Sequence, residues 1–372
     1  MKKVLLISFE FPVGKSYCGG VGQVVKESRK ALLALGHEVY VLIGRELHGK
    51  HPVKLLLPDG SLKRYPTFWA FRREHNWFKF NYIIQNFVNW TKELRKIKNH
   101  KGRRPKIVYH FHSILRREKD MGFRTLNAYL LNQERMIDIA DKVICPSRYE
   151  YDNFMRYFPS FRKKVVLIEN TLEVFPFKSM RKRAIVKKHG IKKSDVVSIY
   201  VGRLERVKGA DTVIDQVPKV LRRHKNLKVF VVGKVRERDL YRKLLRTQKK
   251  FPDQLFYIRY MDKAELFQYY YLSQIYLNTS LSESFSLTTH ESALCSNALL
   301  LNDLPVFDKF KEASLFFSNH DNNGGNFSSR FEHLLRSNRL RERLGRRANR
   351  IAKDFLARNR FRRDFAKFFQ EN

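Results

Sequence analysis

Two basic side chains follow the first buried strand of the second half of the chain. The segment reads Val201-Gly202-Arg203-Leu204-Glu205-Arg206-Val207-Lys208-Gly209, directly after a strand expected over 196–201. Ligands of parallel sheets bind beyond the carboxyl ends of the strands. Arg offers a planar fork for phosphate oxygens and Lys a compact charge, so Arg203 and Lys208 suit a diphosphate. The alternative is a pair of solvated charges in a basic protein.

Two carboxylates eight residues apart flank a later loop. Glu283 and Glu291 come after a strand expected over 275–277, and Glu291 lies in the first turns of a helix that begins near Thr288. A carboxylate there can accept both hydroxyls of a ribose, while the N–H groups and dipole of the helix hold a diphosphate. Two Glu at this spacing are also common by chance.

Glycines cluster between the first strand and the first helix, in the run Cys18-Gly19-Gly20-Val21-Gly22. Such glycines let backbone N–H groups approach an anion at a helix N-terminus. The spacing is neither that of the dinucleotide fingerprint nor that of a P-loop. A tight turn without a ligand is the other interpretation.

These segments are positioned by two series of strands that alternate with helices. Short apolar runs predict strands over 4–9, 38–43, 107–111, 142–145 and 165–168, and then over 196–201, 227–232, 255–258, 275–277 and 298–301. Helical patterns cover 24–35, 125–139 and 211–222, and 326–372 is helical and strongly basic. Residues 175–193 are rich in Pro, Lys and Arg and are expected to form a linker. No strand with an acidic residue and a His precedes Ile107, so the first domain is expected to be abridged.

The pattern predicts an α/β protein with two Rossmann-like, doubly wound domains that face each other across a cleft. We expect an N-terminal domain over 1–175 and a C-terminal domain over 176–352. The remaining residues, 353–372, are expected to form a helix that packs back toward the N-terminal domain.

Taken in order, these segments resemble the GT-B glycosyltransferases of the large retaining group that includes glycogen synthases and bacterial mannosyltransferases. The resemblance covers nearly the whole chain. Six segments carry it: the Gly-Gly-Val-Gly loop at Gly19, His110-Phe111-His112-Ser113, 140–147, Ile168-Glu169-Asn170-Thr171, 202–209, and Glu283 to Glu291.

The resemblance implies roles for the matching residues. Arg203 and Lys208 would bind the donor diphosphate and stabilise the leaving nucleotide, Glu291 would bind the ribose, and Glu283 would lie near the transferred sugar. The other implied donor and acceptor contacts are the backbone amides of Phe285, Ser286 and Leu287, the loop glycines Gly19 and Gly20, Asn170, and His112, with His110 as a rival two residues earlier on the same strand face.

By this resemblance the chain is a retaining transferase that moves a sugar from a nucleoside-diphosphate sugar to an acceptor hydroxyl on a glycan or a lipid-linked molecule. Neither a cofactor nor a metal is expected, since no ligand cluster has suitable spacing. Ser284, Ser286 and Asn297 stand where the family usually has Gly. These departures leave the donor sugar open. They also leave open a catalytically impaired homologue that binds polyanions.

The composition favours polyanionic partners. Lys and Arg number 75 against 36 Asp and Glu, a formal net charge of +39. The three Cys are widely spaced, which fits a reducing cytoplasm. No apolar stretch approaches the length of a membrane span.

All three Trp (Trp69, Trp77 and Trp90) lie with many Lys and Arg between Leu62 and Lys106. That combination predicts attachment to an anionic membrane, on its inner face. A buried aromatic helix with a solvated basic face is the alternative. Nucleic acid is not expected, because no nucleic-acid motif is present.

Overall fold

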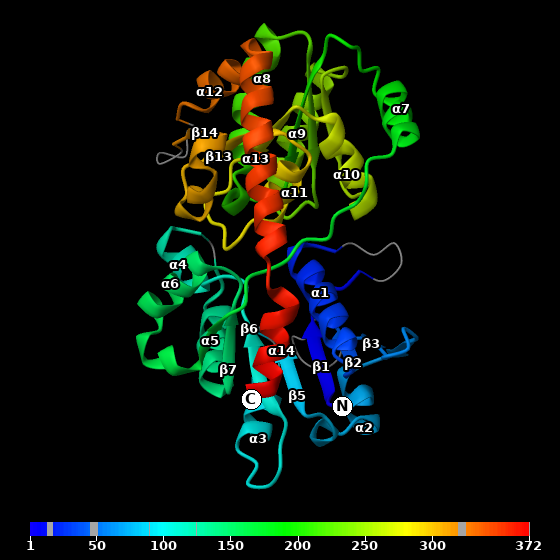
Figure 1. Cartoon of the computed structure of the whole chain (residues 1–372), viewed down its shortest axis with the longest axis vertical. Coiled ribbons are helices and arrows are strands. Elements are labelled where there is room, and N and C mark those ends of the chain that lie inside the picture. Colours follow the sequence, from blue (N-terminus) through cyan, green and yellow to red (C-terminus); the bar gives the residue numbers. More distant parts are fainter. Residues whose placement is uncertain (13–17, 45–50, 89, 124, 319–324, 372) are drawn as a thin grey trace. The chain divides into compact units, whose positions relative to one another are not determined.

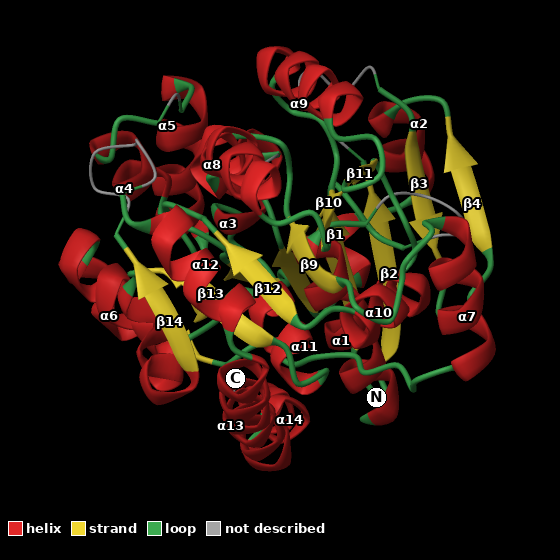
Figure 2. Cartoon of the chain, turned by 90° about the horizontal axis from the view of Figure 1, so that it is seen from above, coloured by secondary structure: helices red, strands yellow, loops and turns green. Residues whose placement is uncertain are grey.

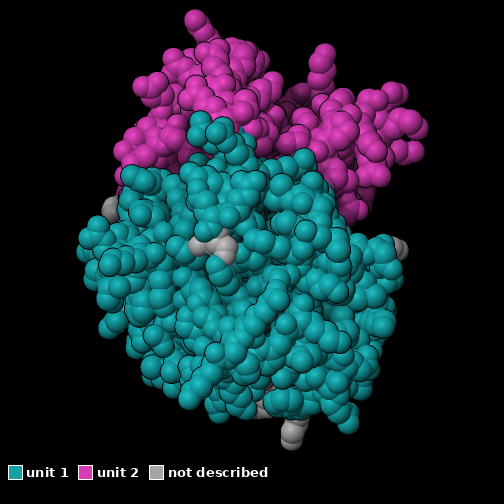
Figure 3. All heavy atoms as spheres, turned by 60° about the horizontal axis from the view of Figure 1, so that its bottom comes forward, with its two compact units in different colours: residues 1–171, 359–372 teal, residues 172–358 magenta. Residues whose placement is uncertain are grey.

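The computed structural model describes residues 1–12, 18–44, 51–88, 90–123, 125–318 and 325–371. The chain divides into two compact units, drawn in different colours in Figure 3. The first unit comprises 1–171 together with 359–372, and the second comprises 172–358. The boundaries that the sequence placed after 175 and 352 therefore fall after 171 and 358.

The first unit is built on an eight-stranded sheet with the order β4-β3-β2-β1-β5-β6-β7-β8 (Figure 1). All neighbouring pairs from β2 to β8 are parallel, and β3 and β4 add an antiparallel edge. The strands are β1 Lys3–Ser8, β2 Glu38–Ile43, β3 Val53–Leu56, β4 Leu62–Tyr65, β5 Tyr82–Gln85, β6 Lys106–His110, β7 Lys142–Cys145 and β8 Val165–Leu167. Parallel strands with helical crossovers leave all the carboxyl ends at one edge.

The helices of the first unit cover this sheet. They are α1 Gly20–Ala34, α2 Phe68–Glu74, α3 Thr91–Lys98, α4 Leu115–Asp120, α5 Asn127–Ile139, α6 Arg148–Tyr157 and α14 Phe361–Glu371. The last of these, α14, is far away in sequence but packs against α1. Its residues Phe365 and Phe369 are buried in the same apolar cluster as Val25 and Leu32 of α1.

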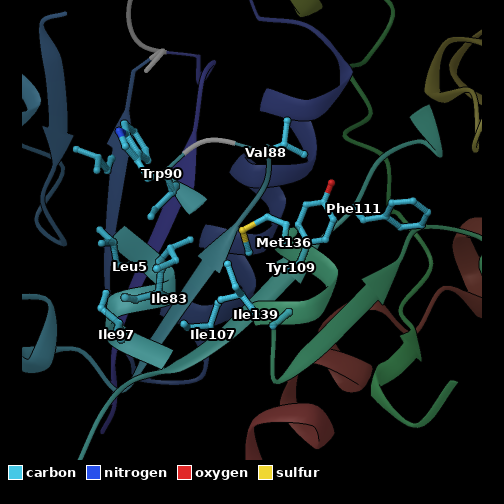
Figure 4. Close-up of a cluster of buried hydrophobic side chains, with 14 of the residues drawn as sticks. Leu5, Ile83, Val88, Trp90, Ile97, Ile107, Tyr109, Phe111, Met136 and Ile139 are labelled. Atoms are coloured by element: carbon cyan, nitrogen blue, oxygen red, sulfur yellow. The ribbon is translucent and has the colours of Figure 1, made fainter. Parts of the chain in front are cut away.

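The region between β3 and β6 corrects two expectations. The first domain is not abridged, because β5 inserts between β1 and β6 and β3 and β4 extend the sheet. The aromatic residues of this region also lie mostly inside the unit. Trp77 and Trp90 are 1% and 3% exposed and belong to one buried cluster, part of which Figure 4 shows with Trp90 labelled. Trp69 is 48% exposed. The prediction that the Trp side chains contact an anionic membrane is therefore wrong for Trp77 and Trp90.

The second unit has a six-stranded parallel sheet with the order β11-β10-β9-β12-β13-β14. In Figure 2, α8 and α9 lie on one face of it and α10 and α11 on the other. The strands are β9 Val196–Val201, β10 Leu227–Val232, β11 Leu255–Ile258, β12 Ile275–Asn278, β13 Ala298–Asn302 and β14 Ser314–Phe317. The helices are α7 Ser179–Lys188, α8 Ala210–Arg223, α9 Arg238–Lys250, α10 Lys263–Leu272, α11 Leu287–Leu294, α12 Phe327–Arg336 and α13 Asn338–Arg358. The expected linker at 175–193 thus contains α7.

Candidate active site

The loops after β9 and β12 meet at the carboxyl edge of the second sheet. The two strands are parallel neighbours, with Tyr200 paired with Leu277. The Leu281 amide donates to the Val207 carbonyl at 3.0 Å, which ties the loops together. The sequence placed its basic pair in one of these loops and Glu283 in the other, and the structure brings the two loops together.

Lys208 is the residue that joins them. Its Nζ lies 3.0 Å from Glu283 Oε1 and donates to the Ser282 carbonyl at 3.4 Å. The Ser280 hydroxyl also donates to Glu283, at 2.7 Å. The side chains of Lys208 and Glu283 keep 22% and 12% of their surface exposed, so the pair is sheltered but accessible.

Gly209 and Tyr200 fix the backbone that carries Lys208. Gly209 has a φ of +61°, and a Cβ there would lie 1.8 Å from the Thr279 carbonyl oxygen, so only Gly fits. The Thr279 hydroxyl donates to the Gly209 carbonyl at 2.7 Å. The buried Tyr200 hydroxyl lies within hydrogen-bond reach of the carbonyls of Arg203 and Lys208, at 3.3 and 3.0 Å. The loop is thus held rigidly from both sides.

Arg203 is oriented separately from Lys208. Its guanidinium forms an ion pair with Glu205 at 2.7 Å, and 40% of its side chain is exposed. Arg206, between them in sequence, forms ion pairs with Glu237 and Asp239 instead. Among the ion pairs of these three cations, it is Lys208 that pairs with Glu283.

Glu291 projects from α11 into a buried polar contact. It forms an ion pair with Lys263 at the start of α10 and accepts a hydrogen bond from Tyr270 at 3.4 Å. Only 3% of its side chain is exposed. The sequence predicted the placement of Glu291 in the first turns of a helix but gave no reason to single out Lys263, one of 75 basic residues. The ribose-binding role of Glu291 stays a prediction.

The first turn of α11 contains the other predicted donor contacts. Ser286 is its N-cap residue, with a φ of +61°, and Leu287 is its first residue. A helix leaves the amides of its first turn without intrahelical partners, and these can bind an anion. The Ser286 hydroxyl receives a hydrogen bond from Asn278 at 3.1 Å and contacts the Thr289 hydroxyl at 2.8 Å.

Phe285 and His290 anchor this turn to the core. Their rings stack with centroids 4.4 Å apart, and the Phe355 ring of α13 packs beside both. Burial, reinforced by the nearby Lys309 cation, lowers the pKa of His290 to about 3, so its ring is neutral. The sequence did not single out His290, although it lies next to Glu291.

In the first unit, Gly19 and Gly20 lie at the N-terminus of α1 as predicted, but a carboxylate is already there. Glu10, just after β1, accepts a hydrogen bond from the Gly22 amide at 3.1 Å. A Cβ on Gly19 would approach Glu10 Oε1 to 2.8 Å, so the loop glycines make room for this side chain. Nothing in the local sequence links Glu10 to Gly22, which lies twelve residues further along the chain.

The two candidate histidines differ in accessibility. His110 is fully buried near Phe365 of α14, and among the described residues neither of its ring nitrogens has a hydrogen-bond partner. His112 lies beyond the end of β6, half-buried, with Nε2 3.4 Å from the side-chain oxygen of Asn86. Burial lowers the pKa of His112 to about 4, so it too is neutral. Of the two, His112 is the more exposed, and its partner is Asn86, which follows the unpredicted β5.

Asn170 also belongs to the first unit. It is 5% exposed, and its backbone binds the Pro146 carbonyl and, through its own carbonyl, the Asn359 side chain before α14. Its side-chain oxygen is buried and has no hydrogen-bond partner within the ranges that the structure describes. In the part of the chain that the structure describes, no three His, Cys, Asp or Glu side chains are grouped so that they could hold a metal ion. Nor does any helix there have the length and apolar character of a membrane crossing.

Two family models match the chain, one in each half. Residues 181–351 match glycosyl transferases group 1, and residues 18–174 match glycosyltransferase family 4. A curated relative, alpha-monoglucosyldiacylglycerol synthase of Acholeplasma laidlawii, is 22% identical over 350 residues, which is 85% of this chain and 83% of the relative.

Solved structures share the fold over the full length. A sucrose-phosphate synthase from Thermosynechococcus elongatus superposes with a TM-score of 0.75 at 18% identity, covering 100% of this chain and 99% of that one. The Anabaena protein Alr3699/HepE, in complex with UDP and glucose, superposes with a TM-score of 0.72 at 15% identity and covers 100% of both chains.

Proposed function

Because the chain belongs to the GT-B glycosyltransferases, which use nucleotide-sugar donors, we propose that it transfers a sugar from a nucleoside-diphosphate sugar to a hydroxyl of a lipid acceptor, with retention of configuration. One observation carries the proposal. Lys208, Glu283 and the N-terminal turn of α11 converge at the carboxyl edge of the second sheet, where ligands of such sheets bind.

In the proposed reaction the leaving diphosphate develops negative charge, and Lys208 and Arg203 stabilise it. Preorganised cations and amides aimed at such a charge are the largest contribution to many enzymes' rates. Lys208 is already oriented by Glu283, and the amides at the start of α11 supply further donors. These groups let the reaction proceed without a metal ion.

The acceptor hydroxyl attacks the face that the diphosphate leaves, which gives retention. The new bond forms at the anomeric carbon as its bond to the phosphate oxygen breaks, and the hydroxyl proton passes to an oxygen of the departing diphosphate. Glu283 would lie near the transferred sugar, and Glu291 would bind the ribose while Lys263 keeps it in place. In the first unit, His112 and Asn86 supply neutral hydrogen-bonding groups for the sugar or the acceptor. The lipid nature of the acceptor is supported by the relative that is a glucosyldiacylglycerol synthase.

Calorimetry with UDP, ADP and GDP tests donor binding first. The nucleotide that binds is then supplied as its sugar conjugates together with a diacylglycerol in detergent micelles. We expect labelled sugar in the organic phase, an anomeric configuration equal to that of the donor by NMR, and undiminished turnover in EDTA. Absence of binding by every nucleoside diphosphate would refute the transferase.

The high positive charge supports one other candidate, a homologue without transferase activity that binds polyanions. The same calorimetry separates the two. The polyanion-binding candidate predicts that the wild type binds no nucleoside diphosphate. It also predicts that Lys208→Ala leaves the binding of polyanions unchanged.

A further inference from the structure

A recess at the amino edge of the first unit's sheet is lined by five cations and no carboxylate. Its volume is about 390 Å³. The cations are Lys2, Lys79, Arg103, Arg104 and Lys106, and they surround Asn81. In a protein with many surface charges an exposed Lys is ordinary, but five cations that line one hollow create a local positive potential that attracts an anion.

The floor of the recess is rigid because Asn81 joins three strands. Its side-chain oxygen accepts from the Lys3 amide at 2.7 Å, its own amide donates to the Lys3 carbonyl at 2.8 Å, and its carbonyl accepts from the Lys106 amide at 2.9 Å. Lys3 and Lys106 begin β1 and β6, and Asn81 directly precedes β5, near the N- and C-terminal ends marked in Figure 1. The six residues of β1 separate this edge from the carboxyl edge by about 17 Å. The recess is therefore distinct from the candidate active site.

Two of the cations are held in place by other contacts. Arg104 binds both oxygens of Asp141, at 2.8 and 2.9 Å, and Lys98 binds the same carboxylate. Lys2 donates to the Tyr82 hydroxyl at 3.2 Å and to the Phe369 carbonyl of α14. Their positions are thus set by the fold and do not depend on a ligand.

The rim of the recess is exposed. Lys79 and Arg103 lie there in solvent, next to Phe78, which is 39% exposed. A second hollow, of about 430 Å³, adjoins the first. It shares Tyr82, Arg104 and Lys106 with the first, and its lining also contains Lys142 and the carboxylate of Asp141. A ligand could therefore place its anionic group between the rim cations while the rest of it extends along the surface.

We propose that this recess binds a phosphate group, carried either by the headgroup of an anionic phospholipid or by a free phosphate-bearing solute. Arg103 supplies a planar fork and Lys79 and Lys106 supply point charges, the combination that phosphate oxygens prefer. The proposal is independent of the transferase reaction, because none of its residues belongs to the candidate active site.

The test uses the full chain and two probes. Co-sedimentation compares vesicles of phosphatidylcholine and phosphatidylglycerol with vesicles of phosphatidylcholine alone. Calorimetry measures inorganic pyrophosphate with each protein prepared in the Arg203→Ala/Lys208→Ala background, so that the diphosphate site proposed at the second sheet does not add to the signal. If the protein binds the mixed vesicles but not pyrophosphate, the ligand of the recess is the phospholipid headgroup. If it binds pyrophosphate, the ligand is a free phosphate-bearing solute. Each Lys or Arg near such a surface contributes about fivefold, so Lys79→Gln/Arg103→Gln should weaken binding by about 25-fold at low salt.

Two further variants make the result specific. Lys249→Gln/Lys250→Gln removes the same charge from exposed positions of α9 and should bind like the wild type. Lys79→Arg/Arg103→Lys keeps the charge and should keep most of the binding. The proposal is overturned if the wild type binds neither probe, if Lys79→Gln/Arg103→Gln binds normally, or if the α9 variant weakens equally.

Discussion

Replacing Lys208 by Ala should abolish most of the transferase activity while leaving the fold intact. Its Nζ is 3.0 Å from Glu283 and its backbone is fixed by the contact between Gly209 and Thr279. The cation is therefore preorganised at the carboxyl edge of the second sheet, and the Ala side chain leaves nothing in its place.

The magnitude follows from the charge and its surroundings. A unit charge about 4 Å from a developing negative charge, at an effective dielectric constant of about 20, contributes about 4 kcal/mol. The measured cost of deleting one preorganised oxyanion donor is similar, about 3–4 kcal/mol. Turnover should therefore fall by roughly 100- to 1,000-fold, with a smaller change in KM because the charge grows as the diphosphate departs. Because Lys208→Ala leaves Glu283 without this ion-pair partner, it should also lower the free energy of unfolding, but only by about 1–3 kcal/mol.

The assay is steady-state release of the nucleoside diphosphate. Arg206→Ala is the matched control, because Arg206 lies in the same loop but pairs with Glu237 and Asp239; it should keep near-normal turnover. Equal losses in both variants would mean that only the general positive field matters. Recovery of activity in Lys208→Ala/Glu283→Ala would show that Lys208 merely neutralises Glu283, and would also refute this reasoning.

Three further outcomes are expected. Glu291→Gln should weaken nucleotide binding at least tenfold by calorimetry, since it loses a charged hydrogen-bond acceptor; unchanged affinity would remove its ribose role. Gly209→Ala should lower the melting temperature far more than Gly190→Ala, because both have positive φ but only Gly209 meets a carbonyl oxygen at 1.8 Å; equal shifts would contradict the packing argument. Burial lowers the pKa of His290 to about 3. Below pH 6.5 the unfolded state therefore takes up a proton that the folded state does not, and the free energy of unfolding should decrease as the pH is lowered. Between pH 7 and 5 the wild type should lose about 2 kcal/mol more than His290→Gln in urea unfolding, and parallel curves would be inconsistent with a buried neutral ring.

The parts of the fold that the sequence predicts well are those with a strong local pattern. The unit from β1 through α1 to β2 and the strands β9 and β10 are apolar runs separated by a glycine turn or an amphipathic helix. By contrast, β5 is only four residues long and lies among aromatic and basic residues, so its pattern is hidden. Because the sequence did not predict β5, the first domain was expected to be abridged, and Asn86 was not identified as a candidate site residue.

Partners distant in sequence are the other part that the sequence cannot supply. Glu283 and Lys208 were both predicted, because each follows a strand and parallel strands share an edge. Lys263 and Glu10 were not predicted. Lys263 meets Glu291 through the packing of α10 on α11, and Glu10, just after β1, meets the amide of Gly22 in α1. Nothing in the local sequence separates Lys263 from the many other cations.

The departures from the family's glycines are accommodated in ways that support the site. Ser286 takes a left-handed backbone that costs a residue with a Cβ about 1–2 kcal/mol. Its hydroxyl, held by Asn278 and Thr289, offsets that cost within the first turn of α11. Asn297 donates to the carbonyl of Tyr270 at 3.0 Å and to the Ser292 hydroxyl at 2.8 Å, so it binds α10 to α11. These two helices carry Lys263 and Glu291. The polar replacements thus stabilise the helices that hold Glu291, for which a donor-binding role is predicted, and this favours the proposed transferase over an impaired homologue.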